Sequence, residues 1–110
     1  MKPLQGITVI EMARVLACPL AGMILAELGA RVIKIEQPGS GDETRGYEPF
    51  AAASEHAEDD QNSHERSAYY YAFNGSKESI SVNLRAPEGQ EIIRRLTKDA
   101  DVVIENFPTG

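Results

Sequence analysis

The chain has 110 residues, 42% of them hydrophobic and 25% charged, which suits one globular domain with a modest core and is too short for two. The formal net charge of −6 argues against a general nucleic-acid binder, because such proteins need a basic surface. The single cysteine, Cys18, excludes an internal disulfide, and no apolar run approaches the roughly 20 residues of a membrane span. No signal peptide is evident after Met1. We expect a cytoplasmic protein with neither nucleic acid nor membrane as a partner.

The first third of the chain predicts a strand, a helix and a second strand. Residues 7–12 are β-branched and apolar enough for a strand. Pro19 suits the first turn of a helix, residues 20–28 carry a single charge, and Gly29 suits a left-handed cap. A helix that is apolar on almost every side is expected to be buried. Residues 31–36 alternate charged and apolar side chains, which predicts a second strand. A strand, a helix and a strand in this order form a right-handed crossover, which makes the two strands parallel.

The middle of the chain begins with a turn at residues 38–42, Pro-Gly-Ser-Gly-Asp. Periodicity is then lost from residue 43 to 67. The polar, acidic stretch at about 51–67 predicts a mobile surface loop, not a second domain or a linker. Residues 69–73, Tyr-Tyr-Tyr-Ala-Phe, predict a short helix that packs on the sheet.

The last third repeats the pattern of strand, helix and strand. Residues 79–84 alternate with period two and predict a third strand, and Pro87 opens a helix. The apolar run at 102–104 predicts a closing strand that is buried on both faces of a parallel sheet. Ligands of open α/β sheets gather at the carboxyl ends of such strands, where Asn106 and Phe107 stand.

A dinucleotide site would use Glu36, at the end of the second strand, to hold a ribose. Residues 13–20, Ala-Arg-Val-Leu-Ala-Cys-Pro-Leu, stand where the motif G-x-G-x-x-G is needed for close approach of a pyrophosphate. Without those glycines we reject NAD as the ligand, and we expect Glu36 to be a solvated strand end.

Other candidate sites are weaker. His56 and His64 match no tetrahedral metal spacing, and a mobile loop cannot preorganise ligands, so we expect no metal. Cys18 could be a nucleophile at a helix N-terminus, but a small buried hydrophobe is the favoured interpretation. Arg85 and Lys77 could hold phosphates, with ordinary solvated charges slightly favoured.

A set of motifs, none of them specific alone, recurs in one order along the chain. The motifs are Leu4-x-Gly6-Ile-x-Val-Ile-Glu11, Leu16-Ala17-x-Pro19, Leu25-Ala-x-Leu-Gly-Ala30, Val32-Ile-Lys-Ile-Glu36, Pro38-Gly-x-Gly-Asp42, Thr44-Arg45, Phe73-Asn74, Lys77-x-Ser79-Ile80, Pro87-Glu-Gly89 and Ala100-Asp-Val-Val-Ile-Glu-Asn-Phe107. In this order they resemble the N-terminal part of the class III (CaiB/BaiF-type) coenzyme A transferases, a family that includes α-methylacyl-CoA racemases.

The resemblance implies an α/β fold with a Rossmann-like parallel sheet and flanking helices. Residues 1–110 would be the N-terminal part of the CoA-binding domain in a larger transferase subunit, which forms an interlocked homodimer. Coenzyme A or acyl-CoA would be a substrate, and no cofactor would be bound permanently. Carried over by position, the CoA contacts are Val15, Leu16, Ala17, Gln37, Val82, Asn83, Leu84, Arg85, Asn106 and Phe107.

The implied reaction moves coenzyme A between an acyl-CoA and a carboxylic acid through an aspartyl-CoA intermediate. The family's nucleophilic aspartate lies well downstream of the Asn-Phe pair, so we assign no catalytic residue here, and Asp99 and Asp101 do not qualify. We expect the chain alone to be inactive. An acyl-CoA racemase of the same family and a non-catalytic CoA- or nucleotide-binding module stay open as alternatives.

The chain departs from the family pattern at several places. Cys18 stands where relatives usually have glycine, and Gln37 lacks the positive charge that some members carry. Glu78 replaces a cation, which would weaken the local attraction for phosphate.

Overall fold

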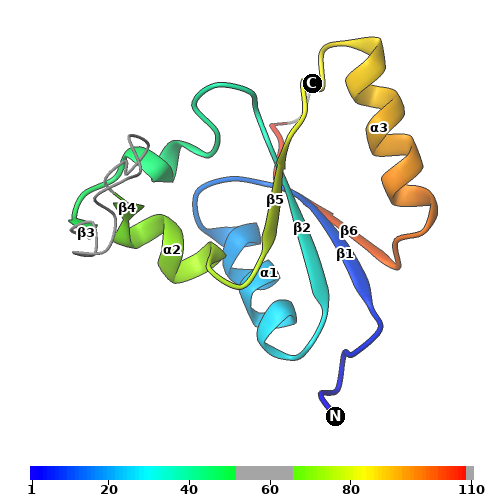
Figure 1. Ribbon diagram of the computed structural model, residues 1–110, viewed down its shortest axis with the longest axis horizontal. Coiled ribbons are helices and arrows are strands. Elements are labelled where there is room, and N and C mark those ends of the chain that lie inside the picture. Colours follow the sequence, from blue (N-terminus) through cyan, green and yellow to red (C-terminus); the bar gives the residue numbers. More distant parts are fainter. Residues whose placement is uncertain (52–65, 109–110) are drawn as a thin grey trace, which may run out of the picture.

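A computed structural model describes residues 1–51 and 66–108 of the chain. It shows one four-stranded parallel sheet with helices on both faces, so the expected α/β fold class is confirmed (Figure 1). The predicted acidic loop lies almost entirely outside the described residues. No helix within the described ranges is long and apolar enough to cross a bilayer.

The sheet has the strand order β5-β2-β1-β6, and every neighbouring pair is parallel. Its strands are β1 (Thr8–Met12), β2 (Arg31–Glu36), β5 (Glu78–Ser81) and β6 (Val102–Glu105). All four were predicted, although β5 is shorter than the expected 79–84. All four carboxyl ends therefore meet at one edge of the sheet, where ligands bind in folds of this kind.

Each face of the sheet is covered by one long helix. Because side chains alternate along a strand, Ile10, Ile33 and Ile35 face α3 (Pro87–Lys98), while Val9 and Val32 face α1 (Ala17–Glu27). Figure 1 shows α3 on one side of the sheet and α1 on the other. Gly29 follows α1 with a φ of 105°, as expected of a left-handed cap.

The expectation that the first helix is buried on almost every side is wrong. In α1 only Pro19 and Gly22 are buried, Leu20 and Ile24 are exposed, and Leu28, directly after the helix, is exposed too. The helix packs on the sheet along one side and also contacts residues 68–74, while these apolar side chains stay open to solvent. Uniform apolar composition therefore did not reveal which face of the helix is covered here.

The closing strand is also less buried than expected. Within the described residues β6 pairs only with β1, so it forms an edge of the sheet. Val102 and Val103 are 39% and 45% exposed, which contradicts burial on both faces. A strand with one neighbour and an uncovered face leaves its branched side chains in contact with solvent.

Between β2 and β5 the chain forms small elements. A 3-10 turn, η1 (Glu43–Gly46), is followed by an antiparallel pair of β3 (Phe50–Ala51) and β4 (Arg66–Ser67), and by α2 (Ala68–Asn74). The helix α2 was predicted. The turn and the two-residue strands were not, because they are too short to show a period.

Candidate functional site

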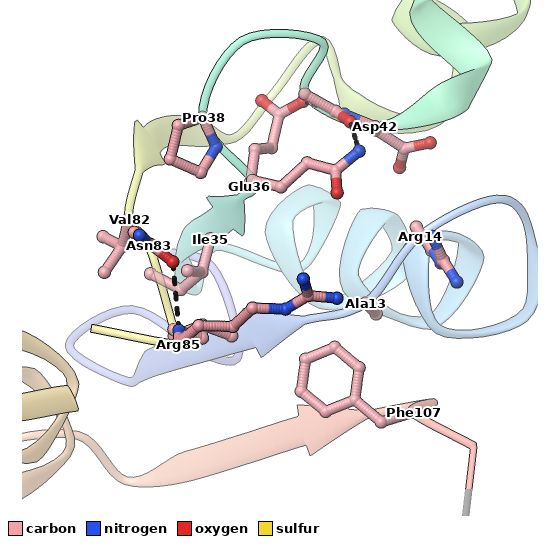
Figure 2. A pocket seen from close by; sticks show the side chains of 13 residues that line it. Ala13, Arg14, Ile35, Glu36, Pro38, Asp42, Val82, Asn83, Arg85 and Phe107 are labelled. Carbon is pink, nitrogen blue, oxygen red and sulfur yellow. Dashed lines mark hydrogen bonds between the residues drawn. The ribbon is translucent and has the colours of Figure 1, made fainter. Parts of the chain in front are cut away.

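A cleft of about 740 Å³ opens at the carboxyl ends of the strands. Its lining comes from the segments that follow β1, β2, β5 and β6, as the parallel topology requires (Figure 2). The volume is in the range of small-molecule sites. Of the predicted contacts, the lining includes Gln37, Val82, Asn83, Leu84, Arg85 and Phe107.

The other four predicted contacts do not line this cleft. Val15, Leu16 and Ala17 follow Ala13 and Arg14, which do line it, so the loop between β1 and α1 borders the cleft through its first two residues. Sequence reasoning missed Arg14. Its only signal was a cation two positions after the end of the first strand.

Arg85 and Phe107 give the cleft a cation and an aromatic surface. In Figure 2 the Arg85 side chain extends across the cleft, and the Phe107 ring faces it from the end of β6. Phe107 is 47% exposed. Within the described ranges, no carboxylate lies at ion-pair distance from Arg85. A guanidinium without a carboxylate partner is available to bind an anionic ligand.

Asn106 ties the end of β6 to the end of β1. Its Oδ1 accepts a hydrogen bond from the Arg14 backbone N–H at 3.2 Å, and its Nδ2 donates one to the Arg14 carbonyl at 2.9 Å. Close by, the Cys18 thiol lies 3.3 Å from the Glu105 carbonyl, to which it donates. A contact between Asn106 and CoA stays a prediction, and in the structure its amide fixes the backbone beside the cleft.

A buried charge cluster, formed by Glu11, Lys34, Asp42 and Lys77, lies beneath the loop between β1 and α1. The Lys34 Nζ is 3.0 Å from Glu11 Oε2, 2.9 Å from Asp42 Oδ2 and 3.0 Å from the Ala13 carbonyl oxygen. The side chains of Glu11, Lys34 and Asp42 are fully buried. Two cations and two anions make the cluster neutral, which burial of this kind requires.

Lys77 joins the same cluster from the turn before β5. Its Nζ lies 2.6 Å from Glu11 Oε1 and donates to the carbonyl of Pro19 at 2.9 Å and to Asn74 Oδ1 at 2.8 Å. Burial lowers the pKa of Lys77, and the Glu11 carboxylate partly opposes that effect. With a side chain only 1% exposed, Lys77 is neither a solvated charge nor placed to hold a phosphate.

Glu36 is not a solvated strand end, because its side chain is 3% exposed. Arg45 binds both oxygens, at 2.7 Å from Nε and 2.6 Å from Nη2, and Tyr70 Oη donates at 3.1 Å. Ser79 and the backbone N–H of Asp42 also donate. Burial alone would raise the pKa of Glu36, but these donors outweigh it and lower the pKa to about 2. Both oxygens are engaged, so the carboxylate serves the fold and is not free to bind a ribose.

Among residues 1–51 and 66–108, no three acidic, histidine or cysteine side chains are placed together so that they could hold a metal ion. His56 and His64 lie outside the described residues.

Comparison with known proteins gives one consistent result. The sequence model of CoA-transferase family III matches residues 4–110. The chain is 51% identical over 105 residues to the succinate–glutarate CoA-transferase of Agrobacterium fabrum, covering 96% of this chain and 25% of that protein. It is 42% identical over 109 residues to the succinyl-CoA:glutarate CoA-transferase of Homo sapiens, covering 99% and 22%.

Solved structures agree. A CaiB/BaiF family protein from Brucella suis superposes with a TM-score of 0.83 at 45% identity, over 96% of this chain and 26% of that one. The protein Rv3272 of M. tuberculosis superposes with a TM-score of 0.79 at 34% identity, over 99% and 28%. The chain spans about a quarter of the length of these relatives.

Proposed function

The chain belongs to CoA-transferase family III, and from that premise we propose that residues 1–110 form the N-terminal part of the CoA-binding domain of an acyl-CoA transferase. The complete protein would move coenzyme A from an acyl-CoA to a free carboxylic acid. Membership of this family makes coenzyme A the ligand to test first. The cleft contains side chains suited to binding it.

The observation that carries this proposal is the pairing of Arg85 with Phe107 in the cleft at the carboxyl ends of the strands. An acyl-CoA has phosphate groups and an adenine ring. A guanidinium suits the phosphates, and an exposed aromatic ring suits the flat face of the adenine. The same cleft includes six of the ten residues predicted to contact CoA.

We propose a small dicarboxylic acid as the acceptor. Relatives with 51% and 42% identity are named for the transfer of CoA between succinate and glutarate. In the corresponding reaction succinyl-CoA and glutarate would yield succinate and glutaryl-CoA, so the thioester bond is broken and re-formed without net hydrolysis.

The nucleophile of the proposed aspartyl-CoA intermediate would lie outside residues 1–110. Asp42 borders the cleft, but its oxygens are engaged with Lys34 and Thr44. Asp101 caps the start of β1 by accepting from the Thr8 N–H at 2.9 Å, at the amino end of the sheet. Covalent catalysis needs a carboxylate that can reach the acyl carbon. We therefore propose that the 110-residue chain alone transfers no CoA.

We also propose that the complete protein forms an interlocked homodimer. The support is the apolar surface left open on the outward side of α1 and along β6. Measuring the mass of the complete protein in solution tests this, and a monomer at micromolar concentration would refute it.

The function is tested with the purified full-length protein, succinyl-CoA and glutarate, by measuring glutaryl-CoA by mass spectrometry. The 110-residue chain serves as the control and should be inactive. Racemisation of a 2-methylacyl-CoA without transfer would favour the racemase alternative. Absence of CoA binding in calorimetry would refute the proposal.

A further inference from the structure

The loop between β1 and α1 has an unfavourable backbone conformation. Val15 has a φ of 70°, in the left-handed region that β-branched residues rarely adopt. Such a conformation persists only where the surroundings fix it, and it is found preferentially at ligand sites. The contacts that fix this loop are therefore the ones to identify.

Two members of the buried charge cluster hold the loop from below. Lys34 Nζ donates to the carbonyl of Ala13 at 3.0 Å, and Asp42 Oδ1 lies 3.4 Å from the backbone nitrogen of Val15, from which it accepts. Lys34 and Asp42 are also paired with each other at 2.9 Å. Both side chains are fully buried in this structure.

The other two members of the cluster hold a different segment. Lys77 donates to the carbonyl of Pro19, within α1, and pairs with Glu11 Oε1. No hydrogen bond joins Lys77 or Glu11 to residues 13–16 in the part of the chain that the structure describes. The two pairs are joined by the bond of Lys34 to Glu11 Oε2 at 3.0 Å, but among the described residues Lys34 and Asp42 bond to the loop, whereas Lys77 bonds to the helix.

We propose that Lys34 and Asp42 are positioning residues for CoA binding, which keep residues 13–16 in the shape that borders the cleft. This inference rests on the proposed function, because the ligand at stake is coenzyme A. Ala13 and Arg14 line the cleft directly. When Lys34 is lost, the strained backbone at Val15 relaxes and displaces them.

Two charge-neutral double variants of the full-length protein separate this role from plain stability. Lys34→Met with Asp42→Asn removes one cation and one anion, and with them the bonds of Lys34 to Ala13 and Glu11. It keeps the pair of Glu11 and Lys77, and it keeps the Oδ1 atom that caps η1 and accepts from Val15. Glu11→Gln with Lys77→Met is the matched control, because it also ends the ion pair of Lys34 with Glu11 but keeps the pair of Lys34 and Asp42 and the bond to Ala13.

The first variant should raise the KM for the CoA thioester, and the Kd for CoA in calorimetry, by about tenfold, since a buried hydrogen bond from a charged group is lost. Its kcat and its KM for the carboxylic acid should stay within about threefold of wild type. The control should be destabilised to a similar degree in thermal unfolding, with its KM for the CoA thioester within about twofold of wild type. Equal changes in the two variants, or an unchanged KM in a folded first variant, would overturn the proposal.

A second measurement needs no variant. In the wild-type protein the Val15 amide should exchange with solvent deuterium as slowly as the amides of β1, because its acceptor is a buried carboxylate. Exchange at the rate of an unprotected amide would overturn the proposal even if the first variant fails to fold. A wild-type protein that binds no CoA but protects the Val15 amide would instead refute the proposed function and leave the positioning of the loop standing.

Discussion

Replacing Arg45 by methionine should cost more stability than its partly exposed position suggests. Arg45 makes two short hydrogen bonds to Glu36, and the Glu36 side chain is 3% exposed. Methionine keeps an unbranched side chain but removes the guanidinium, whose Cζ lies 4.0 Å from the centre of the Tyr70 ring. Without Arg45, the donors that remain to the buried carboxylate among the described residues are Tyr70, Ser79 and the Asp42 N–H.

The size of the expected loss in the free energy of unfolding depends on the burial of Glu36 and on the partial exposure of Arg45. Breaking a fully buried ion pair costs about 3–5 kcal/mol, because a charge is left without a partner. The Arg45 side chain is 40% exposed, so water can enter where it stood, and three donors remain for Glu36. We expect a loss of about 2–3 kcal/mol in the free energy of unfolding at pH 7.

Urea denaturation of the full-length protein measures this loss, with Arg31→Met as the matched control. Arg31 binds Glu78 with the same two-bond geometry, at 2.7 and 3.1 Å, but both side chains are more than half exposed. Water and salt screen such a pair, so the control should leave the denaturation midpoint unchanged. Equal effects of the two substitutions would show that burial of Glu36 is not the cause.

Three further outcomes are expected. Gly22→Ala places a methyl group onto Glu11 Oε1 and should lower the free energy of unfolding, measured in urea, by about 2 kcal/mol or more. In the control Gly46→Ala the added methyl group meets nothing within 4 Å, so the free energy of unfolding should not change. Equal effects of the two substitutions would refute the close packing of α1. Because the pKa of Glu36 is about 2 when folded and 4.5 ordinarily, its contribution of at most ~3 kcal/mol is complete above pH 4.5 and is lost as the pH falls towards 2. A flat stability profile over that interval would contradict the network. Phe107→Ala should weaken CoA binding about tenfold in calorimetry, and an unchanged affinity would remove this ring from the site.

The strands could be predicted from the sequence because their signal is local. Residues 31–36 show the period of two, and β2 has the same bounds. What the alternation could not tell is which face is solvated. Glu36 was expected to be solvated, but both Glu36 and Lys34 are buried, and each is neutralised by a side chain from the turn and the short helix that follow β2. Further partners come from β1, α2 and β5, whose positions beside these side chains depend on the tertiary fold.

The part of the site that could be predicted is the part that follows from the order and direction of the strands. Parallel strands bring their carboxyl ends together, so Arg85 and Phe107 meet in one cleft although 22 positions of sequence separate them. The role of Asn106 as a backbone clamp was not predictable, because it depends on the distance between β6 and the chain after β1. Arg14 was missed for the same reason.

The charges on the face of the sheet that α1 covers also restrict how its strands can align. In the observed register Glu11 of β1 stands beside Lys34 of β2, and Val9 stands beside Val32. A slip of two residues would keep every side chain on its own face, so hydrophobic patterning alone would tolerate it. Such a slip would place the Lys34 ammonium beside Val9. It would also separate the Glu11 carboxylate from Lys34, its partner. An unpaired buried charge costs several kcal/mol, so the cluster makes misaligned sheets less stable than the native one. A face made only of valine would not distinguish between these registers.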